Sequence, residues 1–222
     1  MARIARVVVP GIPHHITQRG VRRMDVFFSD DDRREYLKQL ADQGERFGVQ
    51  YIAWCLMDNH VHLIAVPTTE SSLAKGIGEA HKRYSRMINF REGWRGYLFQ
   101  GRFFSCPLEG SYAIAAIRYV LGNPVRAKLC KQPWDYVWSS ARWMIGLAES
   151  DPLATRSSLL SEIDDWRSLL KRGPTEAADI RKHTRSGRPL CSDAFLQYLE
   201  LLTGRELRLR KAGRKPKVTN SC

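Results

Sequence analysis

The feature of the sequence that most restricts its fold is a pair of apolar, β-prone runs, residues 49–57 and 60–66, separated only by Asp58 and Asn59. Two such runs joined by two residues are typical of a tight antiparallel hairpin. A chain that contains this hairpin is expected to have an antiparallel sheet.

The segments around the hairpin supply elements of both kinds. A helix is expected after Ser29, which is a good N-cap followed by three Asp residues, and it should end before Gly48. Periodicity and turn residues predict the other elements: a strand at 14–19, a helix at 72–89, a strand at 103–108 and a helix at 111–122. This order predicts an α+β fold with a ferredoxin-like antiparallel sheet (β-α-β-β-α-β), with the helix at 111–122 as an additional element.

The chain carries a large positive charge. Its 222 residues include 36 Lys and Arg against 23 Asp and Glu, a formal net charge of +13, which favours a polyanionic partner such as nucleic acid. No apolar run approaches the roughly 20 residues of a membrane span, and residues 1–13 do not resemble a signal peptide. We therefore expect a cytoplasmic protein with no membrane partner. The five cysteines are widely scattered and are expected to be reduced thiols.

The sequence divides into two parts near residue 145. Residues 1–145 hold all the elements above and are expected to form one domain with its own core. Beyond them the pattern weakens, and residues 146–222 are expected to be a C-terminal helical extension. Its parts are a linker at 148–158, short helices at 159–170 and 193–202, and a disordered basic tail at 210–222 that we expect to anchor DNA.

The sharpest chemical signal is DNHVHLI, in which His60 and His62 alternate with Val61 and Leu63. Side chains alternate along a strand, so both imidazoles should point to one face, about 7 Å apart along the chain. Two imidazoles so placed can hold one divalent cation. The alternative is a pair of partly buried histidines that are satisfied by the backbone and by neighbouring groups.

The second signal is the helical segment YAIAAIRYVLGNP. One stripe of this helix holds Tyr112, Ala116, Tyr119 and Asn123, and an aliphatic stripe holds Ile114, Ile117 and Leu121. We expect the aliphatic stripe to face the core, which leaves Tyr119 at a different edge. A tyrosine phenol is a usable nucleophile when a metal polarises the group that it attacks, and Asn123 could add an oxygen ligand. Taken alone, the pattern also fits an interfacial tyrosine and an asparagine that ends the helix.

A basic and aromatic segment, residues 82–103, lies between the two signals. It interleaves cations with Tyr, Phe and Trp, a mixture that suits phosphates and unstacked bases together. Ordinary packing of aromatic side chains under a solvated cationic face explains the same pattern. The cations that we expect to bind DNA here and near the first strand are Arg19, Arg22, Arg23, Lys82, Arg83, Arg86, Arg95 and Arg102.

Four segments together resemble a known family. PHHITQRGVRR, CLMDNHVHLI, YLFQGRFF and RYVLGNPVRAKLC, in this order, are similar to the HUH single-tyrosine transposases, specifically to the REP-associated tyrosine transposase branch. The resemblance covers residues 1–143. It implies that His60, His62 and Asn123 bind Mg²⁺ or Mn²⁺ and that Tyr119 is the catalytic nucleophile. Asp58 stands two places before the first histidine, where the family commonly has Pro or Glu. The position of Asp58 is not a ligand position.

The resemblance also implies a reaction. Family members act on single-stranded DNA next to hairpins, here those of palindromic repeats. The tyrosine attacks the scissile phosphate, a 5′-phosphotyrosine forms, and a free 3′-hydroxyl leaves that can later reverse the step without ATP. This implies a metal-dependent DNA transposase with endonuclease and strand-transfer activity. Some related transposases exchange the tyrosine helix between two subunits, whereas this branch can build the site within one chain, so a monomer is expected over a homodimer.

Two other functions fit parts of the pattern. An amidohydrolase also begins with H-x-H on a strand, but it needs further metal-binding histidines, and only His81 and His183 follow His62. A non-catalytic hairpin DNA- or RNA-binding protein on the same fold is the stronger rival. Against it stands the joint presence of the two H-x-H histidines, Tyr119 and Asn123, which binding alone does not require.

Overall fold

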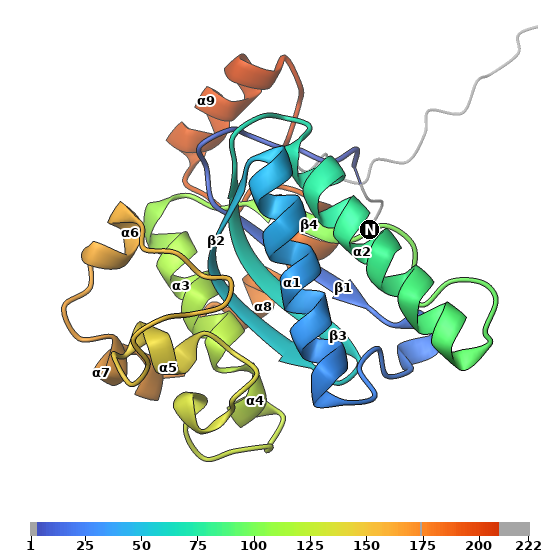
Figure 1. Cartoon of the computed structure of the whole chain (residues 1–222). Helices are drawn as coiled ribbons and strands as arrows, with labels where there is room; N and C mark the ends of the chain where they lie inside the picture. Colours follow the sequence, from blue (N-terminus) through green and yellow to red (C-terminus); the bar gives the residue numbers. More distant parts are fainter. Residues whose placement is uncertain (1–3, 174, 209–222) are drawn as a thin grey trace, which may run out of the picture.

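The centre of the molecule is a four-stranded antiparallel sheet. The structure is a computed structural model that describes residues 4–173 and 175–208, so the predicted basic tail lies outside the described residues. The strands β1 (His14–Arg19), β2 (Val49–Met57), β3 (His60–Pro67) and β4 (Phe104–Pro107) follow the order β2-β3-β1-β4 (Figure 1). With α1 between β1 and β2, and α2 between β3 and β4, this confirms the ferredoxin-like α+β fold.

Helices cover both faces of the sheet (Figure 1). α1 (Asp30–Phe47) and α2 (Ser72–Glu92) pack side by side on one face, and α3 (Gly110–Leu121) packs on the other, where α8 (Ala177–Ser186) also contacts β1 and β4. The remaining helices of the described chain are η1 (Val21–Arg23), α4 (Asn123–Arg126), η2 (Pro133–Asp135), α5 (Ala141–Met144), α6 (Ser158–Ser161), α7 (Trp166–Lys171) and α9 (Asp193–Thr203). None of the helices in the described residues combines the length and the apolar character needed to cross a membrane.

Strand alternation divides the core into two layers. Towards α1 and α2, the sheet presents Ile16, Trp54 and Leu63. Towards α3, it presents Cys55 and Ile64, which pack with apolar side chains of α3, α7 and α8. Residues beyond position 145 therefore form part of the second layer.

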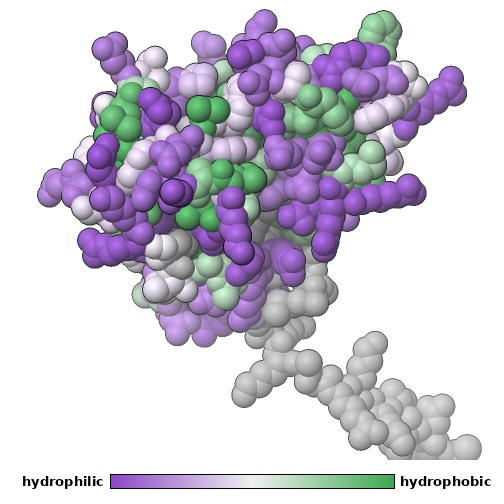
Figure 2. Space-filling model, turned by 90° about the horizontal axis from the view of Figure 1, so that it is seen from below, coloured by the Kyte–Doolittle hydropathy of each residue, from purple (hydrophilic) through white to green (hydrophobic). Residues whose placement is uncertain are grey.

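The lower end of the molecule in Figure 1 carries the N-terminal end of α1, the C-terminal end of α2 and α4. Figure 2 views the molecule from this side and shows hydrophilic side chains over most of the face, with small apolar patches between them. This end of the fold therefore presents a predominantly polar surface.

Several elements differ from the predictions. α2 continues to Glu92, where the left-handed backbone of Gly93 (φ 66°) ends it. β4 is shorter and ends at Pro107, which has no N–H to continue the ladder. The helix predicted at 159–170 is two helices, because the Asp165 side chain caps α7 by accepting a hydrogen bond from the N–H of Ser168. The sequence did not predict α8, because Ile180 is the only apolar residue among the three that this helix buries.

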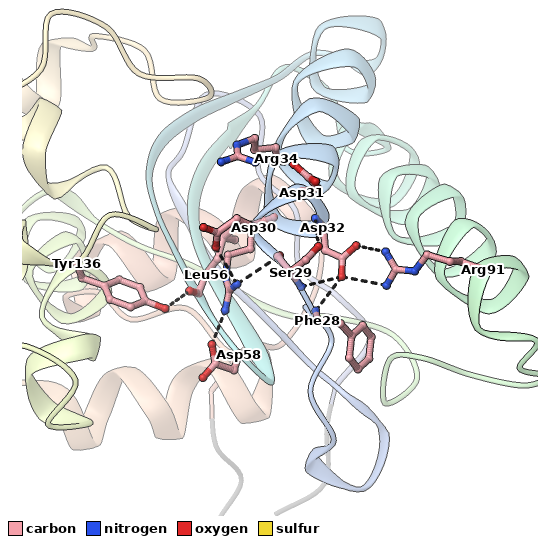
Figure 3. Close-up of polar contacts among 11 residues, drawn as sticks. Phe28, Ser29, Asp30, Asp31, Asp32, Arg34, Leu56, Asp58, Arg91 and Tyr136 are labelled. Atoms are coloured by element: carbon pink, nitrogen blue, oxygen red, sulfur yellow. Dashed lines mark hydrogen bonds and ion pairs between the residues drawn. The ribbon is translucent and has the colours of Figure 1, made fainter.

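A polar network around Asp32 holds the N-terminus of α1 (Figure 3). The Ser29 hydroxyl accepts a hydrogen bond from the N–H of Asp32, and the Asp32 carboxylate accepts from the N–H groups of Ser29 (3.1 Å) and Phe28 (2.8 Å). The same carboxylate pairs with Arg91 at the end of α2, with Nη2 3.1 Å from Oδ2. Burial raises the pKa of Asp32, but these bonds outweigh burial and bring it below its ordinary 3.8. The ionised side chain thus joins the start of α1 to α2.

We expect Asp32→Ala to lower the free energy of unfolding at pH 7 by about 1–3 kcal/mol, because two N–H groups and Arg91 lose their acceptor. The folded pKa is lowered, so this contribution is present above the ordinary pKa of 3.8 and is lost as the pH falls through the folded value. Urea denaturation between pH 7 and pH 3 should therefore show the wild-type and variant stabilities converging in acid.

The matched control is Asp31→Ala. Asp31 is the neighbouring carboxylate, is exposed and pairs with Arg34 one helical turn away, so its removal should change stability much less. Equal losses for the two variants would contradict the role assigned to the Asp32 network.

Candidate active site

His60 and His62 lie together on the face of β3 that is turned towards α3. In the pairing of β3 with β1, Arg19 stands opposite His60 and Thr17 stands opposite His62. The two imidazole rings are 5.1 Å apart between their centroids. His62 is buried and His60 is half-buried. The alternation of H-x-H on a strand thus brings both rings to one place.

Each of the two rings is hydrogen-bonded through its Nδ1. Nδ1 of His60 lies 2.7 Å from Oδ1 of Asn59, whose Nδ2 donates to the carbonyl of Arg23. The second bond fixes the amide with its oxygen towards the ring, so His60 carries its proton on Nδ1 and presents the lone pair of Nε2. Nδ1 of His62 lies 2.9 Å from Nε2 of His15 on β1, so Nε2 of His62 points away from that bond.

Burial keeps these histidines uncharged. Desolvation, reinforced by the charge of Arg19, lowers the pKa of His60 to about 4. Desolvation, reinforced by Arg126, lowers the pKa of His15 to about 3, and it lowers the pKa of His62 well below its ordinary value of 6.5. At neutral pH each ring therefore keeps a lone pair, which is the state in which imidazole binds a metal.

Tyr119 projects from α3 into the same cluster. Its ring makes edge contacts with His15 and His62, at 5.7 and 5.6 Å between centroids. The prediction that Tyr119 lies at an edge away from the core face is wrong: Tyr119 is only 5% exposed and is buried together with Ile117, whereas Ile114 is only partly buried. The reason is that imidazole rings form part of the surface that α3 meets.

Asn123 lies one helical turn after Tyr119 and is held by Arg126. Nη2 of Arg126 donates to Oδ1 of Asn123 at 2.6 Å and to the carbonyl of Tyr119 at 2.7 Å. The guanidinium carbon lies 4.2 Å from the centre of the Tyr119 ring. Nδ2 of Asn123 is buried and has no hydrogen-bond partner among the described residues. Asn123 thus brings one engaged acceptor and one unused donor to the cluster.

The donor set suits a divalent cation. His60 and His62 offer neutral nitrogen donors, and the amide oxygen of Asn123 has a second lone pair. Within residues 4–173 and 175–208, no group of three or more His, Cys, Asp or Glu side chains is placed to hold a metal ion. A cation at the two histidines would therefore take its remaining ligands from an amide such as that of Asn123, from water or from a bound substrate.

Sequence reasoning missed two residues of the cluster, His15 and Arg126. A signal for His15 was available in HHITQR, because alternate positions of that strand share a face and antiparallel pairing sets the face beside H-x-H. For Arg126 the signal is its position three residues after Asn123, a spacing that brings side chains together on a helix.

The predicted DNA-binding residues Arg19, Arg22 and Arg23 lie beside the histidines. Arg22 and Arg23 are exposed and have left-handed backbones, with φ of 53° and 66°, a conformation that costs non-glycine residues about 1–3 kcal/mol. The turn is held because the N–H of Gly20 donates to the carbonyl of Asn59, whose side-chain amide donates to the carbonyl of Arg23. A strained turn held in this way is typical of functional sites.

Three of the other five predicted DNA-binding residues line a cleft between α2 and the loop that follows it. The cleft has a volume of 820 Å³ and is lined by aromatic as well as cationic side chains. Its lining includes Lys82, Arg86, Arg102, Phe90, Trp94 and Tyr97, whereas Arg83 and Arg95 are exposed outside the lining. Gln18 also lines the cleft and alternates along β1 with His15, so the cleft and the histidine cluster lie on opposite faces of the sheet.

A family model described as "Transposase IS200 like" matches residues 9–123, which is more than half of the chain. The chain belongs to the IS200-like transposase family. The matched region contains His15, His60, His62 and Tyr119 and ends at Asn123, so all of these cluster residues except Arg126 lie within it. Membership of this family places the chain among DNA-processing proteins.

The chain is similar to two solved structures, of which the first shares its fold. A REP-associated tyrosine transposase, solved bound to a REP hairpin, matches with a TM-score of 0.57 and 16% sequence identity, over 71% of this chain and 93% of that chain. A putative transposase from Deinococcus radiodurans R1 matches with a TM-score of 0.38 and 16% identity, over 57% of this chain and 92% of that chain. No curated protein matches the sequence significantly. The first likeness supports the fold.

We expect the double variant His60→Ala/His62→Ala to stay folded and to lose Mn²⁺ binding at this cluster. Both core layers of the sheet remain, but His15 loses its hydrogen-bond partner, which should lower stability by about 1–3 kcal/mol. Isothermal titration with Mn²⁺ measures binding, and circular dichroism measures folding.

The control is His81→Gln, which removes an imidazole on the other face of the sheet while keeping a polar group near the hydroxyl of Tyr36. It should bind Mn²⁺ as the wild type does. An unchanged Mn²⁺ affinity in the double variant would show that His60 and His62 are not the ligands.

Proposed function

We propose that the chain is a metal-dependent endonuclease and strand transferase that acts on single-stranded DNA beside hairpins of palindromic repeats, through a 5′-phosphotyrosine on Tyr119. The observation that supports this most is the contact between the rings of Tyr119 and His62 within one chain. A nucleophile and the groups that activate a phosphate must reach the same phosphate, and this contact brings them to one place.

In the proposed reaction, the hydroxyl oxygen of Tyr119 attacks the scissile phosphorus in line with the bond to the 3′-oxygen. A bond forms between the tyrosine oxygen and phosphorus, and the bond from phosphorus to the 3′-oxygen breaks. The phenolic proton passes to solvent, and the departing 3′-oxygen takes a proton from solvent. Attack by a 3′-hydroxyl on the phosphotyrosine reverses the step, restoring a phosphodiester and free Tyr119. One phosphate ester replaces another in each direction, so no ATP is consumed.

Arg126 is well placed to assist the attack. Its guanidinium lies over the ring of Tyr119, and a positive charge at this position stabilises the negative charge that develops on the reacting oxygens. Its bond to Oδ1 of Asn123 also fixes the orientation of that amide. The unpartnered Nδ2 of Asn123 is then a donor available to a phosphate oxygen.

His60, His62 and Asn123 are the residues that would hold Mg²⁺ or Mn²⁺ in this proposal. When bound, the cation would supply positive charge to a non-bridging oxygen of the scissile phosphate. The two imidazoles are neutral at pH 7 because of burial, so they can accept the cation without first losing a proton.

The two cationic surfaces suit the two parts of a hairpin substrate. Arg19, Arg22 and Arg23 lie beside the cluster and can hold the phosphates that flank the cleaved bond. The cleft on the other face combines cations with exposed rings such as Tyr97, which suits unpaired bases. The similar REP-associated transposase was solved with a REP hairpin, and we extend that class of substrate to this chain.

The chain has two parts in this account. Residues 1–145 would be the catalytic domain and residues 146–222 an extension that supports it. Because Tyr119, His15 and His62 meet within one chain, no second subunit is needed to supply the tyrosine helix. A monomer therefore suffices for cleavage. The proposed place of the reaction is the cytoplasm.

We expect Tyr119→Phe to keep its fold and its hairpin binding but to lose cleavage of a labelled hairpin with single-stranded flanks in Mg²⁺. Only the nucleophilic oxygen is removed, so the rate should fall below detection. Tyr112→Phe is the control, since it removes a phenol from the same helix two turns earlier and should cleave normally. Tyr84 is not a rival nucleophile, because its hydroxyl donates to the carbonyl of Val26 inside the opposite core layer.

Cleavage by Tyr119→Phe at the wild-type rate would refute the assignment of the nucleophile. A wild-type protein that binds the hairpin tightly, but never cleaves it in Mg²⁺ or Mn²⁺, would instead favour a non-catalytic hairpin-binding protein. Comparison of binding and cleavage on the same labelled DNA separates these outcomes.

A further inference from the structure

One buried side chain of α8, Thr184, joins the C-terminal extension to the histidine cluster. Oγ1 of Thr184 lies 2.7 Å from Nδ1 of His15, and Nε2 of His15 lies 2.9 Å from Nδ1 of His62. The exposed fractions are 2% for Thr184, 1% for His15 and 6% for His62. The three side chains therefore form a continuous hydrogen-bonded chain, largely closed to water, from the extension to the sheet.

Only one arrangement of protons satisfies every member of this chain. The hydroxyl of Thr184 donates to the carbonyl of Ile180, one helical turn back, at 2.7 Å. A hydroxyl has a single hydrogen, so its oxygen can only accept from His15. His15 must then carry its proton on Nδ1 and accept on Nε2, and His62 must carry its proton on Nδ1. Nε2 of His62 is left with its lone pair.

We propose that Thr184 is a positioning residue that fixes the tautomer of His62 through His15, so that Nε2 of His62 is kept ready to bind a divalent cation. This rests on the metal role proposed above for His60 and His62. The two ligands are oriented by different means, because His60 is fixed locally by Asn59, whereas His62 is fixed from a helix far along the chain. Removing such outer partners typically weakens metal binding by about 10–100-fold.

Thr184→Val tests the idea because it keeps the shape of the side chain and removes the hydroxyl. The Nδ1–H of His15 would then have no acceptor in a buried position. His15 and His62 avoid this unpaired N–H if both rings change tautomer. His15 then donates from Nε2, and His62 accepts on Nδ1. His62 would then carry its proton on Nε2, the nitrogen that is needed for the cation.

The experiment combines two measurements on the full-length protein. Long-range ¹H–¹⁵N correlation spectra of metal-free, ¹⁵N-histidine-labelled protein report which nitrogen of His62 is protonated. We expect Nδ1–H in the wild type and in Thr184→Ser, and Nε2–H in Thr184→Val. Titration with Mn²⁺, followed by calorimetry, should give a dissociation constant at least about tenfold higher for Thr184→Val, with Thr184→Ser close to the wild type.

Cys106→Ala is the packing control. The sulfur of Cys106 lies 3.4 Å from Oγ1 of Thr184, so this variant disturbs the packing around Thr184 but keeps its hydroxyl. It should leave the His62 tautomer and the Mn²⁺ affinity unchanged. A loss of affinity equal to that of Thr184→Val would mean that packing, and not the hydroxyl, supports the site, and it would overturn the proposal.

A wild-type His62 protonated on Nε2 would overturn the proposal by itself, even if Thr184→Val failed to fold. An unchanged tautomer and Mn²⁺ affinity in a folded Thr184→Val protein would also overturn it. A wild type that shows the expected tautomer but binds no Mn²⁺ would refute the proposed metal role while supporting the tautomer assignment. The two proposals can therefore fail separately.

Discussion

The antiparallel pairing of β1 with β3 is the constraint on which the whole site depends. Its register sets Thr17 opposite His62 and places His15 on the same face. A slip of one residue between the two strands would put His15 on the opposite face from His62, among the side chains that α1 and α2 cover. The N–H of Gly20 helps to hold the register by donating to the carbonyl of Asn59. Only glycine fits there, because a Cβ would lie 2.1 Å from the carbonyl oxygen of Met24.

Burial keeps the imidazoles of the cluster neutral. It also means that other parts of the chain must supply hydrogen-bond partners for the buried polar groups. Imidazoles on an open sheet would titrate near their ordinary pKa of 6.5, but desolvation under α3 keeps His15 and His62 neutral. Buried polar rings need hydrogen-bond partners, and the partner of His15 comes from α8. Arg126 meets the same demand for the carbonyl of Tyr119 and the side-chain oxygen of Asn123. The C-terminal extension is therefore tied to the site by polar groups as well as by apolar packing.

Much of the fold follows from local sequence signals. Ser29 and Asp32 form the capping box that begins α1, Gly48 ends it in a left-handed conformation, and the hairpin turns at positions 58 and 59. The H-x-H alternation and the helix of Tyr119 were also predictable. The sequence could not show that Tyr119 faces the sheet, because helical periodicity gives the faces of a helix and not the element that each face meets. It could not show Thr184 either, since this contact joins positions 169 residues apart along the chain.

The central claim is that Tyr119 becomes covalently joined to the 5′ end of cleaved DNA. Mass spectrometry of tryptic peptides, after reaction with a single-stranded hairpin substrate in Mg²⁺ and denaturation, tests it most directly. Trypsin should release residues 119–126 as one peptide, because it cuts the chain after Arg118 and after Arg126. The account predicts that this peptide carries the nucleotide adduct on Tyr119. An adduct on another residue, or cleaved DNA with no protein adduct during turnover, would contradict it.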